Sequence, residues 1–289
     1  MPSGHSGKVD IQGAELSVYD PSTSTRFTGS DLVNTIIHFK HDSGVTFDIL
    51  IDAVDKQTVS YVTGNPDLIT VYEMKARVST AYKKGFAFFV CNNDELDFDP
   101  TWTSSESHYA LVFRGDRYDG DALTAMSIDP RSPWAFIACN GSAATKLQLW
   151  RHTYAGAFSR GYPTYLTPIA KRTAMLKAIT ADYCGNGTSF TVAGTPLVFA
   201  TAEAPNAWPF HWSHTLFSVE ARWTPYGASC LDEPRRLYYD GWPTHADVEW
   251  ACGHPIARCT TGATSFPEGW YKEDDEVITG NPNPALPPP

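Results

Sequence analysis

This sequence is poor in charge and has no segment typical of a membrane-spanning or nucleic-acid-binding protein. Only 19% of its 289 residues are charged, below the roughly 25% of an average globular protein. No run approaches the ~20 apolar residues that a transmembrane helix needs. Basic residues cluster at most in pairs, such as Lys171-Arg172 and Arg235-Arg236. Because phosphate binding requires clustered basic side chains, these pairs and the net charge of −10 argue against nucleic acid or an anionic membrane as the main partner.

The sequence also lacks the short motifs that mark common catalytic and cofactor sites. It has no glycine-rich phosphate loop, no serine-hydrolase elbow and no His-Glu-x-x-His zinc motif. We therefore expect no cofactor and no metal. The first residues, Met1–Gly7, lack the basic start and apolar run of a signal peptide. Either the protein is cytosolic or a leader has been removed.

Cysteine is scarce but present in an even number. Six cysteines are too few to replace a hydrophobic core, and the 42% hydrophobic content is ample to form one. Their scattered placement favours disulfides that link loops in an oxidising compartment. We therefore expect a secreted or cell-envelope protein.

Alternating apolar residues predict a mostly β protein. Val45–Ile51, Thr70–Val78 and Leu216–Trp223 alternate with the period of a half-buried strand. In the last of these, Val219 and Trp223 are expected to face one way and Glu220 the other. More deeply buried strands are expected at Phe86–Cys91, Tyr109–Phe113 and Trp134–Cys139. Frequent turn residues, including 21 Gly and 21 Pro, favour a sandwich- or barrel-like β architecture stapled by disulfides.

One segment instead predicts a short helix. Thr167-Pro168 supplies a cap followed by proline at the first helical position. We expect a helix of about ten residues after it, ending before Ala181. A tight hairpin around Ala193-Gly194 should follow.

The last residues are rich in proline, asparagine and glycine. We expect Thr279–Pro289 to form neither helix nor sheet but an extended, polyproline-like tail. Such a tail is a candidate surface for self-association.

Cys184 is the most prominent candidate for chemistry. It follows the expected helix end, where the negative partial charge and the adjacent Asp182 would disfavour a thiolate. A disulfide is therefore favoured over a nucleophile, although His211 or His254 could serve as a base in a cysteine-dependent hydrolase or transferase. His211 and His214 could also bind a metal, but a third ligand is not evident.

Several segments together resemble a known family. Ala181–Thr191, with its Ala-Asp-Tyr-Cys-Gly-x-Gly-x-Ser-x-Thr pattern, resembles the motif that names the ADYC-domain proteins, which are bacterial and typically exported. Glu220–Cys230 is similar to that family's second conserved strand and turn, and Ala138–Lys146 to its "cysteine, small residues, lysine" segment. Phe89-Val90-Cys91 falls where the family has a strand ending in cysteine. The resemblance implies an architecture and export, but it does not indicate any activity.

The resemblance also suggests a disulfide pattern. Two cysteines of the family are replaced here by Leu147 and Met175, as expected if those two pair with each other. The six that remain suggest Cys91–Cys139, Cys184–Cys230 and a local Cys252–Cys259 loop, one of fifteen possible arrangements.

These observations predict an N-terminal β region over residues 1–105 and an ADYC-like β region over 106–278, sharing a core, followed by the tail at 279–289. The expected function is a non-enzymatic extracellular or envelope module that binds a partner or self-assembles. Two alternatives to this function stay open. One is the cysteine-dependent hydrolase or transferase described above, and the other is a polysaccharide-binding protein that uses exposed aromatic rings.

Overall fold

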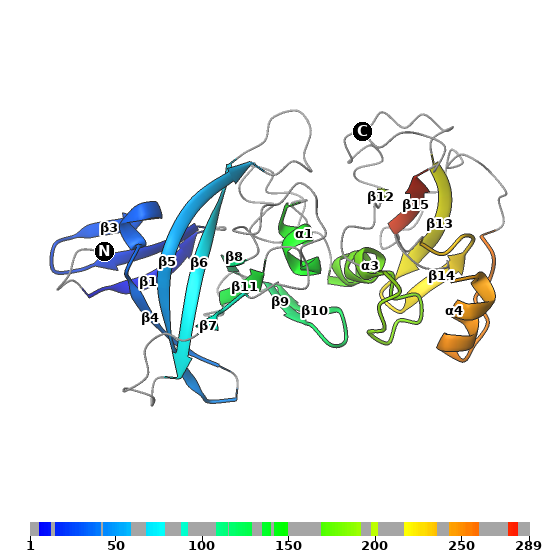
Figure 1. Cartoon of the computed structure of the whole chain (residues 1–289), viewed down its shortest axis with the longest axis horizontal. Coiled ribbons are helices and arrows are strands. Elements are labelled where there is room, and N and C mark those ends of the chain that lie inside the picture. Colours follow the sequence, from blue (N-terminus) through cyan, green and yellow to red (C-terminus); the bar gives the residue numbers. More distant parts are fainter. Residues whose placement is uncertain are drawn as a thin grey trace. The chain divides into compact units, whose positions relative to one another are not determined.

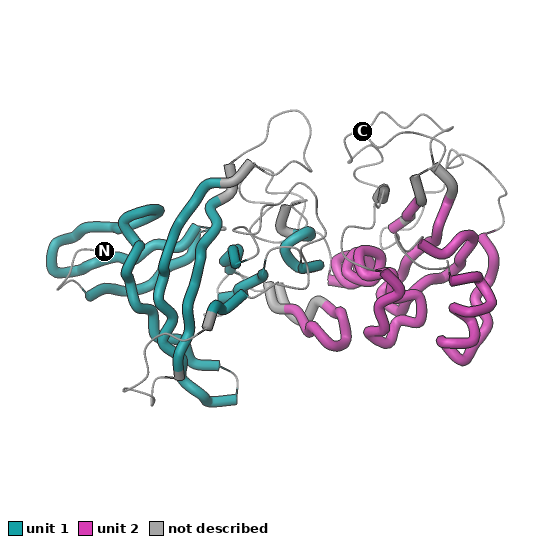
Figure 2. The backbone as a smooth tube through the Cα atoms, viewed as in Figure 1, with its two compact units in different colours: residues 1–60, 66–116, 128–165 teal, residues 61–65, 117–127, 166–289 magenta. Residues whose placement is uncertain are grey.

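The structure is a computed structural model that forms two compact units (Figure 2). Unit 1 comprises residues 1–60, 66–116 and 128–165, and unit 2 comprises residues 61–65, 117–127 and 166–289. The structure describes residues 6–12, 15–41, 43–58, 68–78, 88–91, 108–114, 116–128, 135–139, 142–149, 169–191, 198–201, 217–235, 243–259 and 277–282. The strands of unit 1 come from both sides of residue 105.

Unit 1 is built almost entirely of antiparallel strands (Figure 1). A three-stranded sheet has the order β1-β2-β3, and a six-stranded sheet has the order β11-β8-β6-β5-β4 with β7 beside β6. The strands are β1 (Lys8–Gln12), β2 (Glu15–Asp20), β3 (Thr25–Thr28), β4 (Ile36–Lys40), β5 (Thr46–Thr58), β6 (Leu68–Val78), β7 (Phe88–Phe89), β8 (Tyr109–Arg114) and β11 (Ala135–Cys139). The 3-10 helix η1 (Gly29–Leu32) and helix α1 (Ala143–Leu149) complete its described elements.

The two sheets of unit 1 share one apolar core. It joins side chains from the three-stranded sheet, such as Leu16 and Val18, to side chains from the larger sheet, such as Ile51 and Met74. The long strands β5 and β6 pair over most of their length, and a bulge interrupts their register between Ile51 and Ala53. The predicted β architecture is therefore confirmed, and in unit 1 it consists of two packed sheets.

Unit 2 combines a four-stranded sheet, a hairpin and two helices. Its sheet has the order β12-β15-β13-β14. The elements are β9 (Asp116–Asp119) paired with β10 (Thr124–Ile128), then α3 (Ile169–Thr180), β12 (Val198–Thr201), β13 (Phe217–Thr224), β14 (Gly227–Leu231), α4 (His245–Cys252) and β15 (Val277–Pro282). Helix α3 confirms the prediction from the sequence, while α1 and α4 were not predicted. The Thr167-Pro168 cap and the hairpin around Ala193-Gly194 lie outside the described residues.

Helix α3 is buried on every side. All residues from Lys171 to Ile179 are buried, including the cations Lys171, Arg172 and Lys177. Burying a charge is costly unless it is paired or hydrogen-bonded. The contacts of Lys177 are therefore central to how this helix is held.

The expectation that Thr279–Pro289 is a tail without secondary structure was wrong for its first four residues. Thr279–Pro282 belong to β15, which lies between β12 and β13 in the sheet. Pro282 ends the strand opposite Phe217, where its missing N–H costs little. The side chain of Thr279 is fully buried. Residues 283–289 lie outside the described residues.

Across the described ranges, no helix has the length and apolar character needed to cross a bilayer.

Candidate functional site around the Ala181–Thr188 turn

Residues Ala181–Thr188, here called the signature turn, begin directly where α3 ends. Ala181 has a φ of 53°. The Asp182 N–H donates to the Lys177 carbonyl (2.9 Å), and the Ala181 N–H donates to that of Ala178 (3.3 Å). This is the paired hydrogen-bond pattern that commonly ends a helix, with alanine in the left-handed position that usually holds glycine. The chain therefore reverses sharply, and the next three side chains face different neighbours.

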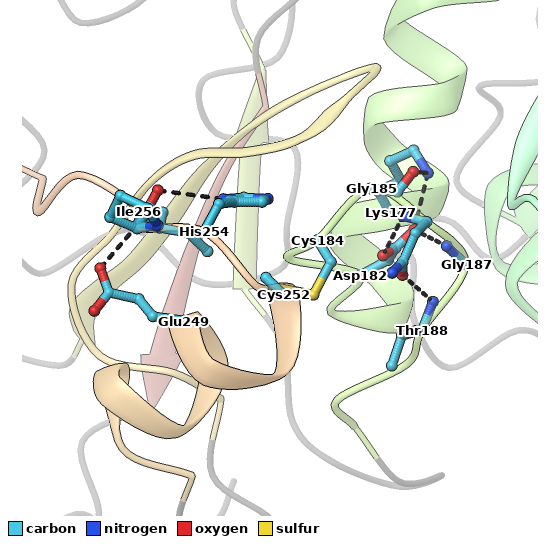
Figure 3. The surroundings of a disulfide bond; sticks show 12 residues. Lys177, Asp182, Cys184, Gly185, Gly187, Thr188, Glu249, Cys252, His254 and Ile256 are labelled. Carbon is cyan, nitrogen blue, oxygen red and sulfur yellow. Dashed lines mark hydrogen bonds and ion pairs between the residues drawn. A yellow bond between two sulfur atoms is a disulfide. The ribbon is translucent and has the colours of Figure 1, made fainter.

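Asp182 forms a buried ion pair at the centre of the turn (Figure 3). Its carboxylate lies 2.8 Å from the Nζ atom of Lys177, and both side chains are about fully buried, at 0% and 1% exposure. The same carboxylate accepts hydrogen bonds from the N–H groups of Asn186 (3.2 Å) and Gly187 (2.9 Å). Lys177 also donates to the carbonyls of Ala122 and Gly185. Each charge thus has several polar partners, which offsets the cost of burial.

Tyr183 links the turn to a second buried ion pair. Its hydroxyl donates to Glu220 Oε1 (2.6 Å) and accepts from the Arg235 N–H (2.6 Å). The Arg235 guanidinium lies 3.1 Å from Glu220 Oε2 and also donates to the carbonyls of Ala178 and Ile179 at the end of α3. Burial, and then the neighbouring Glu220 carboxylate, raise the pKa of Tyr183 well above its usual value. The phenol therefore stays protonated as a hydrogen-bond donor.

The Tyr183 ring continues this network into the sheet. It stacks on Trp223 of β13, with ring centroids 5.1 Å apart and an angle of 21° between the planes. The indole N–H of Trp223 donates to Thr279 Oγ1 of β15 (2.8 Å). The signature turn is therefore connected through two aromatic rings to the central strand of its sheet.

Cys184 is disulfide-bonded to Cys252, the last residue of α4 (Figure 3). As part of a disulfide it has no thiolate with which to act as a nucleophile. The other bonds are Cys91–Cys139 and Cys230–Cys259, so none of the six cysteines is free.

The expected pairing is confirmed for Cys91–Cys139 and was wrong for the other four cysteines. Cys252 faces the signature turn and not Cys259, because it ends α4 and the left-handed Gly253 then turns the chain away. Cys259 lies beside β14 instead, where the Leu231 N–H donates to the Ala257 carbonyl (2.9 Å). Both bonds depend on how distant segments pack, so spacing along the chain does not reveal them.

Of the two histidines considered as partners for Cys184, the structure describes only His254. His254 is exposed, and its Nδ1 atom lies 3.2 Å from the Pro255 carbonyl oxygen. His211 and His214 lie outside the described residues. Within the described parts of the chain, no cluster of three or more His, Cys, Asp or Glu side chains could hold a metal ion.

The turn also leaves no room for a side chain at Gly185. Its φ is +72°, and an added Cβ would lie 1.8 Å from the Tyr226 carbonyl oxygen. Gly253 has a similar φ of +70° but nothing within 4 Å of an added Cβ. We expect Gly185→Ala to destabilise unit 2 by about 3 kcal/mol or more, and Gly253→Ala by only about 1 kcal/mol. Urea denaturation followed by circular dichroism measures both; equal losses would contradict the close approach.

A second polar cluster lies on the larger sheet of unit 1. The Asp52 carboxylate sits at the β5 bulge, 2.6 Å from Lys75 Nζ and beside the Glu73 carboxyl. The Lys75 ammonium lies 5.0 Å from the centroid of the Phe89 ring, on which His108 stacks at 4.0 Å. Partial burial, and then the Asp52 carboxylate, raise the pKa of Glu73. The cluster is a partly exposed charge network in which the Glu73 carboxyl lies beside the Asp52 carboxylate.

The raised pKa of Glu73 predicts a stability that depends on pH. Because the folded pKa of Glu73 is raised, its contribution is fully present below its ordinary value of 4.5 and is lost as the pH rises through the raised value. Glu73→Gln removes that loss. We therefore expect the effect of this substitution on the stability of unit 1 to be about 0.5 to 1 kcal/mol more favourable at pH 7 than at pH 4. Urea titrations at both pH values test this, with Asp55→Asn, at an exposed carboxylate of the neighbouring strand β5, as control. An effect of Glu73→Gln that is equal at both pH values would contradict it.

Reasoning from the sequence missed most of the residues that hold the signature turn. Glu220 lies on the strand face expected to point away from Val219 and Trp223, yet it is fully buried. Arg235 was noted only as part of a basic pair, and Lys177 was given no role. The alternation of β13 carries no signal for a buried carboxylate, because burial of that face is produced by α3 and the turn.

Comparison with known proteins identifies one family. The family model described as ADYC domain matches residues 29–237. No curated protein and no solved structure matches the chain. The matched range covers most of the chain and includes the signature turn, Glu220, Trp223 and Arg235. The chain therefore belongs to the ADYC domain family.

Proposed function

We propose that this chain is an extracellular or cell-envelope module that binds a partner or assembles with copies of itself, and that the signature turn is its structural centre. The observation that carries the proposal is that the turn's functional groups are engaged within the protein. Asp182 is paired with Lys177, the Tyr183 hydroxyl is bonded to Glu220, and the Cys184 sulfur is bonded to Cys252. A reactive centre would need at least one group available to a substrate.

The three disulfides support a location outside the cytosol. Structural disulfides form and persist in oxidising compartments and are rare where thiols are kept reduced. Self-association through residues 283–289 stays a prediction.

The state of the cysteines tests this location directly. In protein exported to an oxidising compartment, thiol counting after unfolding without reductant should find none of the six cysteines free. Protein made in a reducing cytosol should expose thiols and be less stable, because each disulfide contributes about 2 to 4 kcal/mol. Selective alkylation of Cys184 in the exported native protein, or equal stability of the fully reduced protein, would contradict the proposal.

A further inference from the structure

The three disulfides differ in how far their cysteines are buried. In two of them one cysteine is buried, since Cys91 is 1% exposed and Cys259 is 5% exposed. In the third, Cys184–Cys252, both cysteines are partly exposed. A disulfide is opened by a thiolate that attacks one of its sulfur atoms, so the reaction depends on access to that atom. Of the three, the Cys184–Cys252 bond is therefore the most open to a reductant.

The Cys91–Cys139 bond joins two segments of one sheet. Cys139 ends β11, and the Val90 N–H, next to Cys91, donates to the Met74 carbonyl of β6 in the same sheet (2.8 Å). These segments are therefore held by the sheet as well as by the disulfide. After reduction the two thiols would stay close together at a high effective concentration, which favours re-formation of the bond.

The Cys230–Cys259 bond is supported in a similar way. Its two cysteines lie on β14 and on the segment that follows α4. Between these two stretches of chain, the Leu231 N–H donates to the Ala257 carbonyl (2.9 Å). The segment after α4 is thus attached to β14 by the backbone as well as by sulfur, so its thiols would also stay close together after reduction.

Helix α4 has little besides the disulfide to keep Cys252 beside Cys184. Of its eight residues only Val248 is buried. The ring Nε2 atom of His245 is buried as well, and it finds no hydrogen-bond partner among the described residues. Because burying an unpaired polar atom costs free energy, this atom favours a released helix in which water reaches the ring. Reduction would therefore lower the effective concentration of the two thiols more here than in the other bonds.

The chain on both sides of α4 is anchored, so release of the helix would be local. Before it, the buried Arg235 donates from its guanidinium to the carbonyls at the end of α3. After it, Ile256 is buried. Between the helix and Ile256, Gly253 has a φ of +70° and nothing within 4 Å of an added Cβ, which leaves room for the chain to turn. A partly buried hydrogen bond from the Ile256 N–H to Glu249 Oε1 (2.9 Å) crosses this point.

We propose that the Cys184–Cys252 bond is a redox-sensitive latch: in the folded protein a dithiol opens it before the other two disulfides, and its opening frees α4. One thiolate of the dithiol attacks a sulfur atom of the bond and displaces the other cysteine, whose sulfur takes up a proton. The second thiolate then attacks the mixed disulfide and displaces the remaining cysteine in the same way. The dithiol loses two electrons and becomes a disulfide, while the protein gains two thiols. The latch goes beyond the proposed function, because it does not depend on which partner the module binds.

Graded reduction of the full, oxidised chain tests the latch. The protein is equilibrated with mixtures of reduced and oxidised dithiothreitol, its free thiols are blocked with N-ethylmaleimide, and mass spectrometry of peptides locates the blocked cysteines. We expect Cys184 and Cys252 to be blocked at a ratio of reduced to oxidised dithiothreitol about tenfold lower than the other four cysteines require. At that ratio, amide hydrogen exchange should become about tenfold faster over α4 but stay unchanged over β13.

Two variants separate the latch from general destabilisation. Cys184→Ser combined with Cys252→Ser removes the bond, so without reductant this double variant should show the faster exchange over α4 and keep the near-ultraviolet circular dichroism of the folded chain. Val248→Ala removes the buried side chain of α4. It should lower the ratio at which Cys184–Cys252 opens and leave the other two bonds unchanged. Val9→Ala, at an exposed site of unit 1, should change none of the three.

The proposal is overturned if another disulfide opens first, if all three open together, or if Val248→Ala shifts all three bonds equally. Exchange over α4 in the double variant that matches the oxidised wild-type chain would also overturn it, because the bond would then not be what holds the helix. A double variant that does not fold would do the same, since a latch must open without unfolding unit 2. These outcomes are distinct from failure of the proposed function, whose test counts free thiols before any reductant is added.

Discussion

Removing Val277–Pro289 should prevent unit 2 from folding, whereas a chain ending at Pro282 should fold normally. Strand β15 supplies hydrogen bonds to both β12 and β13, so its loss leaves two broken ladders in the middle of a sheet. The fully buried Val277 and Thr279 leave with it, and the Trp223 indole N–H loses its acceptor. The combined loss exceeds the ~5 to 15 kcal/mol by which a typical domain is stable.

The two truncations form a matched pair. The chain ending at Glu276 should lose the near-ultraviolet circular dichroism of the stacked Tyr183 and Trp223 rings, and protease should cut unit 2 readily. The chain ending at Pro282 retains all of β15 and should match the full chain in both measurements. Identical spectra and melting temperatures for both truncations would show that β15 is not essential to the sheet.

Replacing Asp182 with alanine is expected to destabilise unit 2 by about 3 to 5 kcal/mol, because it leaves a buried charge without its partner. Among the described residues, Lys177 would keep only the carbonyls of Ala122 and Gly185 as partners. The N–H groups of Asn186 and Gly187 would lose their acceptor as well. The signature turn should therefore loosen, because these contacts of the fully buried Asp182 side chain hold it together.

Urea denaturation of variants can separate charge from hydrogen bonding in this effect. Asp182→Asn keeps an acceptor but removes the negative charge, so its loss should be smaller than that of Asp182→Ala. Asp121→Ala, at an exposed carboxylate of the same unit, should change stability by less than about 0.5 kcal/mol. If Asp182→Ala resembled Asp121→Ala, the ion pair with Lys177 would have no structural role.

These expectations give the family motif a physical meaning. Ala181 turns the chain out of α3, Asp182 neutralises a buried lysine, and Tyr183 connects the turn to Trp223 and Glu220. Cys184 attaches α4, and Gly185 allows the Tyr226 carbonyl to approach. Asp182, Tyr183, Cys184 and Gly185 therefore each serve a specific contact within the fold.

Local features of the chain predicted a good part of this protein. Strict alternation over Thr70–Val78 predicts β6 because side-chain direction in a strand depends only on the backbone. The run after Pro168 predicts α3 from an equally local signal, because proline favours the first position of a helix. The even number of cysteines and the resemblance around Cys184 predicted disulfides and the family, which the structure and the comparison confirm.

Only the tertiary structure decided how these elements are joined. Cys184 pairs with Cys252 across 68 residues, and Glu220 is buried because α3 and Arg235 cover its side of β13. The segment Val-Ile-Thr-Gly-Asn-Pro was expected to end in a tail, since glycine, asparagine and proline disfavour strands. It forms a central strand nonetheless, because neighbouring strands on both sides supply its hydrogen bonds. Secondary structure follows from local geometry, whereas pairing and burial are set by distant segments that only the folded chain brings together.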